Sequence, residues 1–169
     1  MRLKKSEEEI QLMQKAAKIT SLAHANAMQK VKPGMYEYEL EAEYLYTFMK
    51  RGAKFPAYNS IVGGGDNACI LHYVKNRSIL NEGDLVLVDA GCEFEHYASD
   101  VTRTFPINGK FTNEQKVLYE LVLEAHNESL AEVKPGTPFN KIHDKSVEVL
   151  SEGLISLGLL KGKLSEVIE

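Results

Sequence analysis

The run Leu85-Val86-Leu87-Val88-Asp89 is the feature of the sequence that most restricts the fold. Consecutive apolar residues that include β-branched valines favour a strand, and a strand without polar alternation is buried on both faces. Such a strand lies inside a sheet with other elements packed against it. The run ends in a carboxylate, which is costly beside apolar residues unless a partner neutralises its charge. The sequence therefore predicts a central strand with a charged end.

Helical periodicity precedes this strand and indicates an α/β fold. Ser6 and Glu9 have the spacing of a capping box, and the helix that they begin should end at Pro33-Gly34, because proline interrupts the hydrogen-bond ladder. A second helix is predicted over residues 37–51, followed by strands near residues 61–62 and 69–74. About half of the first helix is apolar or small, in two stripes: Ile10, Met13, Ala17, Met28 and Val31, and Leu12, Ala16, Ile19, Ala23 and Ala27.

A second carboxylate, Asp100, follows Asp89 by eleven residues and begins a predicted return strand over residues 100–107. If the two aspartates face each other in an antiparallel pair, the turn falls between Phe94 and Glu95, and their Cβ atoms lie about 5 Å apart. Opposed carboxylates need a divalent cation or a shared proton, and oxygen ligands favour manganese, magnesium or calcium. The alternative is that either aspartate is a turn residue or an ordinary exposed charge.

Four residues, Val-Lys-Pro-Gly, occur at 31–34 and again at 133–136. Each copy ends a predicted helix and is followed by another, so the order helix, stop, helix recurs. A long repeat of this kind indicates two related lobes, with residues 1–108 as the first and residues 109–169 as the start of the second. The alternative is chance, since Pro-Gly is a common helix stop.

Composition excludes several classes of protein. Hydrophobic residues make up 44% and charged residues 26% of the 169 residues, and the net charge is −4. This balance is that of a globular protein, and it argues against a nucleic-acid-binding surface. We find no apolar run long enough to cross a membrane and no signal peptide at the start. Cys69 and Cys92 lack zinc spacing and indicate reduced thiols. We therefore expect a cytoplasmic protein.

Four segments of the sequence resemble the Xaa-Pro aminopeptidases of the creatinase/methionine-aminopeptidase group, which have the pita-bread fold. The similarity covers nearly the whole chain and rests on these segments: Tyr58 to Asn67, Ile70-Leu71-His72-Tyr73, Val88-Asp89-Ala90-Gly91-Cys92, and Asp100-Val101-Thr102-Arg103-Thr104-Phe105-Pro106. The resemblance implies an α/β pita-bread fold, here the first lobe and the helices of the second. It also implies a metallopeptidase that releases the residue preceding proline from a peptide.

The resemblance further implies a role for each matched site residue. Asp89 corresponds to a ligand of one metal ion, and Asp100 to a ligand that bridges two manganese ions. His72 corresponds to the histidine beside the scissile bond, and Tyr58 to a position near the substrate cleft. From the residues alone, a hydrogen-bonded core histidine is the commoner role for His72. For Tyr58, a turn role fits the sequence as well as a position near the substrate cleft does.

The chain lacks part of the family pattern. The resemblance implies further ligands, a histidine and two glutamates, for which residues 1–169 offer no match, and an N-terminal domain that is also absent. We therefore expect a partial catalytic domain that alone is inactive and binds manganese weakly, within a longer enzyme that the resemblance implies is a homo-oligomer. The alternatives are a proline dipeptidase and a metal-free pita-bread module for protein interaction.

Overall fold

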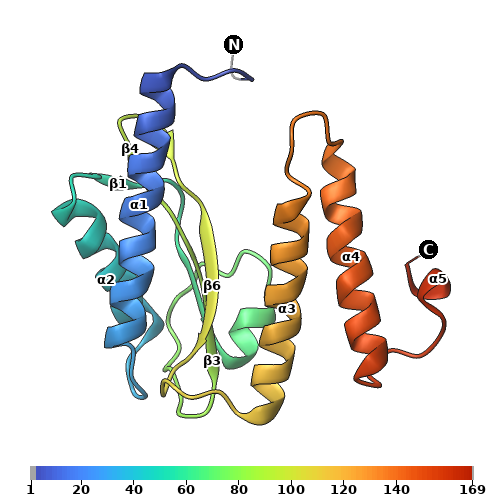
Figure 1. The fold of residues 1–169 in the computed structure, drawn as a ribbon. Coiled ribbons are helices and arrows are strands. Elements are labelled where there is room, and N and C mark those ends of the chain that lie inside the picture. Colours follow the sequence, from blue (N-terminus) through green and yellow to red (C-terminus); the bar gives the residue numbers. More distant parts are fainter. Residues whose placement is uncertain (1–2, 169) are drawn as a thin grey trace. The chain divides into compact units, whose positions relative to one another are not determined.

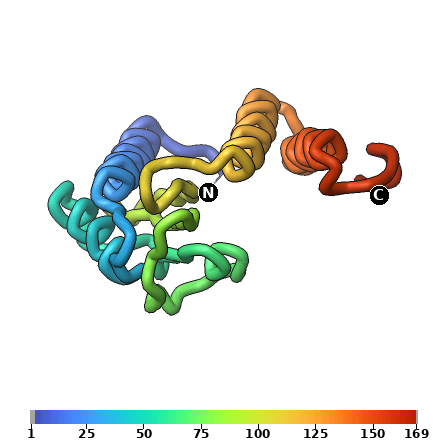
Figure 2. The backbone as a smooth tube through the Cα atoms, turned by 90° about the horizontal axis from the view of Figure 1, so that it is seen from below, coloured from blue at the N-terminus to red at the C-terminus, as the bar shows by residue number. Residues whose placement is uncertain are grey.

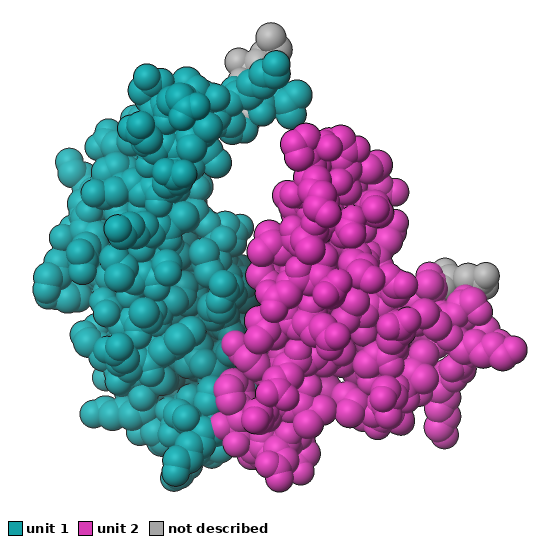
Figure 3. All heavy atoms as spheres, viewed as in Figure 1, with its two compact units in different colours: residues 1–110 teal, residues 111–169 magenta. Residues whose placement is uncertain are grey.

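The structure, a computed structural model, describes residues 3–168; residues 1, 2 and 169 lie outside the description. The chain divides into two compact units, residues 1–110 and residues 111–169 (Figure 3). The elements of the first unit, in chain order, are α1 (Glu7–Lys30), α2 (Glu37–Lys50), β1 (Phe55–Pro56), β2 (Ile61–Gly64), the 3-10 helix η1 (Gly65–Cys69), β3 (Leu85–Ala90), β4 (Cys92–Phe94), β5 (Tyr97–Ala98) and β6 (Val101–Pro106). Those of the second are α3 (Asn113–Ala131), α4 (Phe139–Ser156) and α5 (Leu164–Val167).

The predicted central strand is present in the first unit. β3 lies between β2 and β6 and is antiparallel to both. After Gly91 the chain continues as β4, which pairs with β1 and β5 in a second small sheet. The two sheets share one long hairpin, in which β3 and β4 run out and β5 and β6 return.

Helices α1 and α2 lie side by side and cover one face of the larger sheet (Figures 1 and 2). Val86, Val88 and Ala90 point from β3 into this core and are fully buried. Of the two predicted stripes on α1, the one with small residues faces the core, with Ala16, Ala23 and Ala27 at 0% exposure. Small side chains allow the helix axis to approach the sheet closely. The other stripe is largely exposed: Ile10, Met13 and Met28.

The opposite face of β3 is only partly covered within the first unit. Leu85, Leu87 and Asp89 alternate with the buried valines and are half-buried. The 3-10 helix η1 packs over this face at Gly63, the cross-strand partner of Leu87, where a Cβ atom would lie 2.9 Å from the backbone of Asn67 and Ala68. The prediction that both faces are covered is therefore correct for the first face and only partly correct for the second.

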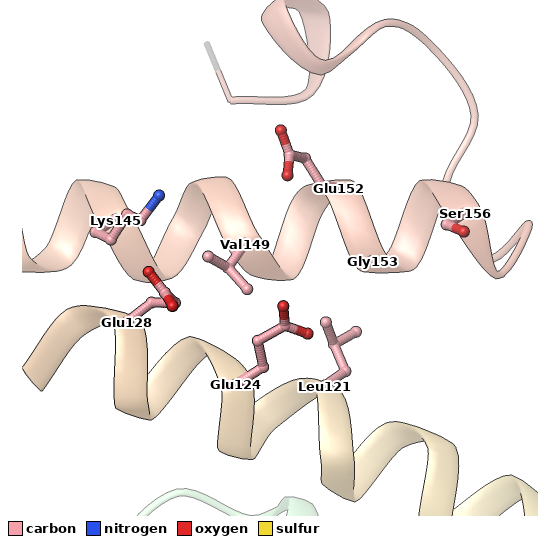
Figure 4. A pocket seen from close by; sticks show the side chains of 8 residues that line it. All are labelled: Leu121, Glu124, Glu128, Lys145, Val149, Glu152, Gly153 and Ser156. Atoms are coloured by element: carbon pink, nitrogen blue, oxygen red, sulfur yellow. The ribbon is translucent and has the colours of Figure 1, made fainter. Parts of the chain in front are cut away.

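The second unit consists of helices. A capping box of Thr112 and Gln115 begins α3, and α4 lies against α3. The two copies of Val-Lys-Pro-Gly have the same backbone turn, because Gly34 and Gly136 adopt left-handed φ angles of 90° and 89°. Between the two helices lies a pocket of about 370 Å³, into which Glu124 points from α3 (Figure 4).

Gly91 joins β3 to β4 where the backbone of Ser99 passes close to it. A Cβ atom at this position would lie 1.7 Å from the carbonyl oxygen of Ser99. We expect Gly91→Ala to lower the free energy of unfolding by about 3 kcal/mol or more, because backbone must move to remove the clash. Urea denaturation followed by circular dichroism measures this change.

Gly109→Ala is the matched control for this prediction. Gly109 has a φ of 75°, and no heavy atom lies within 4 Å of the position that an alanine Cβ would take, so an alanine there meets backbone strain alone. We expect it to cost about 1 kcal/mol. Equal destabilisation by the two substitutions would show that the close approach at Gly91 has no energetic weight.

Candidate metal and active site

Asp89 and Asp100 lie on the same face of the hairpin but do not face each other directly. The cross-strand partner of Asp89 is Thr102, so Asp100 is displaced by two residues from the predicted register. The turn lies one residue later than predicted, because Glu95 and His96 both adopt left-handed φ angles, 49° and 70°, typical of a two-residue hairpin loop. A shift by two residues preserves the face of the sheet, since side chains alternate with period two.

Tyr58 connects the two carboxylates. Its hydroxyl oxygen lies 2.5 Å from Oδ1 of Asp89 and 3.1 Å from Oδ1 of Asp100, so the phenol proton is shared between two acceptors. Burial raises the pKa of the Tyr58 hydroxyl above its ordinary value, and the hydrogen bond to Asp89 acts in the same direction. The hydroxyl therefore remains a donor. Three of the four site residues predicted from the sequence thus form one cluster.

The cluster offers hard oxygen ligands that are open to solvent. Asp89 is half-buried and Asp100 is exposed, so an ion can reach both carboxylates. Their chemistry fits manganese, magnesium or calcium, which prefer carboxylate oxygens. Across residues 3–168, however, no three His, Cys, Asp or Glu side chains converge as a metal site. Two carboxylates by themselves would be only part of a coordination sphere.

His72 lies in a loop and not in the predicted strand. Residues 65–69 form the 3-10 helix η1, and His72 has a left-handed φ of 54° and an exposed side chain. Within the described chain, no hydrogen bond or ion pair joins His72 to Tyr58, Asp89 or Asp100. The strand prediction over residues 69–74 is wrong because side-chain hydrogen bonds, and not a strand ladder, order this segment.

Glu37 organises the loop that carries His72. This carboxylate, in the first turn of α2, is 0% exposed. Oε1 accepts hydrogen bonds from the Gly64 amide (3.0 Å) and the Asn67 side chain (2.9 Å). Oε2 accepts from the Tyr73 hydroxyl (2.8 Å) and the Ser78 amide (2.9 Å). These four donors come from both ends of the loop, so a single buried carboxylate fixes its path.

The sequence gives no signal that distinguishes Glu37 from its neighbour Glu39. Both are glutamates in the first turn of a predicted helix, where acidic residues are favoured by the helix dipole. Glu39 has the ordinary role, accepting a hydrogen bond from the Tyr36 amide at 2.7 Å. Only the folded structure shows that Glu37 points inward.

Comparison with known proteins assigns the family. The model of metallopeptidase family M24 matches residues 11–165, and the chain therefore belongs to this family. It is 52% identical over 169 residues to the Xaa-Pro aminopeptidase of Haemophilus influenzae and 50% identical over 168 residues to that of Escherichia coli. These alignments cover 100% and 99% of this chain but 39% and 38% of the relatives. The chain thus spans less than two-fifths of their length.

Solved structures agree with this assignment. Proline aminopeptidase P II from Yersinia pestis matches with a TM-score of 0.97 and 52% identity over 99% of this chain and 38% of its own. Zinc-substituted Escherichia coli aminopeptidase P in complex with product matches with a TM-score of 0.97 and 50% identity over the same shares. The predicted α/β fold and the resemblance to Xaa-Pro aminopeptidases are confirmed.

We expect Glu37→Gln to lower the free energy of unfolding by about 2 kcal/mol or more. The NH₂ group of glutamine would replace one carboxylate oxygen, so buried donors would lose their acceptor. Amide hydrogen exchange should show faster exchange at Gly64 and Ser78. Glu39→Gln is the matched control in the same helix turn. Glutamine also serves in a capping box, so this variant should stay within about 0.5 kcal/mol of the wild type. Similar losses in both variants would contradict the assigned role of Glu37.

Proposed function

We propose that this chain is part of the catalytic domain of an Xaa-Pro aminopeptidase, which releases the N-terminal residue that precedes proline in a peptide. The observation that carries the proposal is the pair of carboxylates, Asp89 and Asp100, bridged by Tyr58 on an accessible face of the sheet. This cluster occurs in a chain of metallopeptidase family M24 that is 50–52% identical to proteins named Xaa-Pro aminopeptidase.

The aspartates are proposed to hold manganese, in a site for two ions that is completed by ligands other than those described. Such ions, when bound, lower the pKa of water and stabilise the oxygens of the reacting peptide. Asp89 would bind one ion, and Asp100 would bridge both. Tyr58, by donating to both carboxylates, orients their oxygens. Carboxylate oxygens are hard ligands, which fit manganese better than they fit a metal that prefers soft ligands such as thiolates.

His72 is proposed to donate a hydrogen bond to the substrate carbonyl as negative charge develops on its oxygen. Its exposed position on a loop fixed by Glu37 leaves the imidazole free to contact a bound peptide. Tyr58, half-buried beside the carboxylates, would also line the substrate cleft. The division into a first lobe, residues 1–108, and the start of a second, residues 109–169, belongs to the same proposal.

We further propose a cytoplasmic, homo-oligomeric enzyme that does not bind nucleic acid. None of the helices in residues 3–168 is long and apolar enough to span a bilayer. The net charge of −4 disfavours a phosphate backbone as partner.

We expect Asp100→Asn in the full-length protein to lose manganese and to cleave an Xaa-Pro peptide at least about 100-fold more slowly, because removal of a direct ligand should cost at least as much as loss of an outer-shell partner. Metal content by mass spectrometry and product release by chromatography measure the two effects. Asp66→Asn is the matched control at an exposed aspartate of η1 and should retain both properties.

Two results would contradict the proposal. Normal manganese content and turnover in Asp100→Asn would remove the metal assignment. Equal cleavage of Xaa-Pro and Xaa-Ala peptides by the wild type would remove the assigned specificity, and cleavage confined to dipeptides would indicate a proline dipeptidase.

A further inference from the structure

Two buried polar side chains of α1 contact the residues on either side of Asp100. Thr20 and His24, one helical turn apart, are 0% and 4% exposed. Thr20 contacts Ser99, and His24 contacts Val101. Asp100 itself lies outside the strands, between the end of β5 and the start of β6. Helix α1 therefore contacts the Ser99 hydroxyl on one side of Asp100 and the Val101 carbonyl on the other.

The contact on the Ser99 side is a closed hydrogen-bond network. Oγ1 of Thr20 lies 2.7 Å from Oγ of Ser99, and the Cys92 amide donates to both oxygens at 3.2 and 3.1 Å. Ser99 donates its hydroxyl proton to the Cys92 carbonyl at 3.1 Å. The Thr20 hydroxyl is consequently the donor to Ser99. Substitution of Thr20 by an apolar residue would remove the donor that Ser99 now has.

The contact on the Val101 side depends on one tautomer of His24. A carbonyl only accepts, so Nε2 of His24 carries the proton that it donates to the Val101 oxygen at 2.9 Å. Nδ1 then accepts from the Tyr44 hydroxyl at 2.9 Å. Burial lowers the pKa of His24; the hydrogen bond to the Val101 carbonyl opposes this shift, and the Arg103 charge adds to it. A neutral imidazole satisfies both contacts.

We propose that Thr20 and His24 are positioning residues that hold the Asp100 carboxylate in the geometry that manganese binding requires. The inference rests on the proposed function, since it assigns Asp100 as a metal ligand. The Tyr58 hydroxyl contacts one oxygen of the exposed Asp100 carboxylate, so the path of the backbone also decides where this carboxylate lies. Contacts to the Ser99 hydroxyl and the Val101 carbonyl restrict the chain at Asp100 before an ion binds, so binding need not order this residue.

Thr20→Val, at nearly constant volume, tests the proposal in the full-length protein. We expect manganese chloride to bind about 10-fold more weakly in calorimetric titration, the range for loss of a residue that orients a metal ligand. Thr20→Ser keeps the hydroxyl and should bind within about two-fold of the wild type. Thr47→Val is the matched control: Thr47 is a buried threonine of α2, 3% exposed, whose hydroxyl donates to the Glu43 carbonyl.

A second pair of variants keeps the test decisive if Thr20→Val does not fold. His24→Gln retains a side-chain N–H that can donate to the Val101 carbonyl, whereas His24→Leu does not. We expect weaker manganese binding by His24→Leu and partial recovery in His24→Gln. Thermal unfolding of each variant separates loss of binding from loss of fold.

The outcomes separate this inference from the proposed function. Wild-type protein that binds no manganese would overturn both. If the wild type binds but Thr20→Val and His24→Leu bind as tightly as Thr47→Val, the positioning role is overturned and the proposed function stands. Weaker binding in the first two variants, with recovery in Thr20→Ser, would support the positioning role.

Discussion

Two carboxylates placed close together on one face of a sheet repel each other, and this repulsion determines what the residues around them must provide. Asp89 lies in β3 between the buried residues Val88 and Ala90, and Asp100 lies just before β6. Tyr58 is the neutral donor that both oxygens contact. A single proton offsets the repulsion only in part, and a divalent cation would offset it more fully.

Helices α1 and α2 contact the residues around the site through buried polar groups. Thr20 and His24 of α1 contact Ser99 and Val101, on either side of Asp100. Glu37 of α2 accepts hydrogen bonds from the loop that carries His72. The buried polar groups in these contacts have hydrogen-bond partners, so their burial is not strongly destabilising. The core thus does more than bury apolar surface, since its polar members set the positions of residues on the opposite side of the sheet. Gly91 completes this arrangement, because any side chain there would push Ser99 away.

The sequence predicts those parts of the fold that depend on local patterns. The capping boxes at Ser6 and Thr112, the central strand and the shared face of Asp89 and Asp100 all follow from spacing. The register does not, because the left-handed conformations of Glu95 and His96 have no glycine to indicate them. The apolar pattern around His72 predicts a strand, yet tertiary hydrogen bonds to Glu37 determine the path of this loop. The roles of His72 and Tyr58 come from the family resemblance, since spacing alone leaves them open.

The central claim is that Asp89 and Asp100 bind manganese together. Crystals of the full-length protein grown with manganese chloride and measured near the manganese absorption edge test it directly. We predict anomalous density within ligand distance of carboxylate oxygens from both aspartates, with Tyr58 still in contact with at least one of them. Anomalous density that lies elsewhere, or that contacts neither carboxylate, would contradict the account.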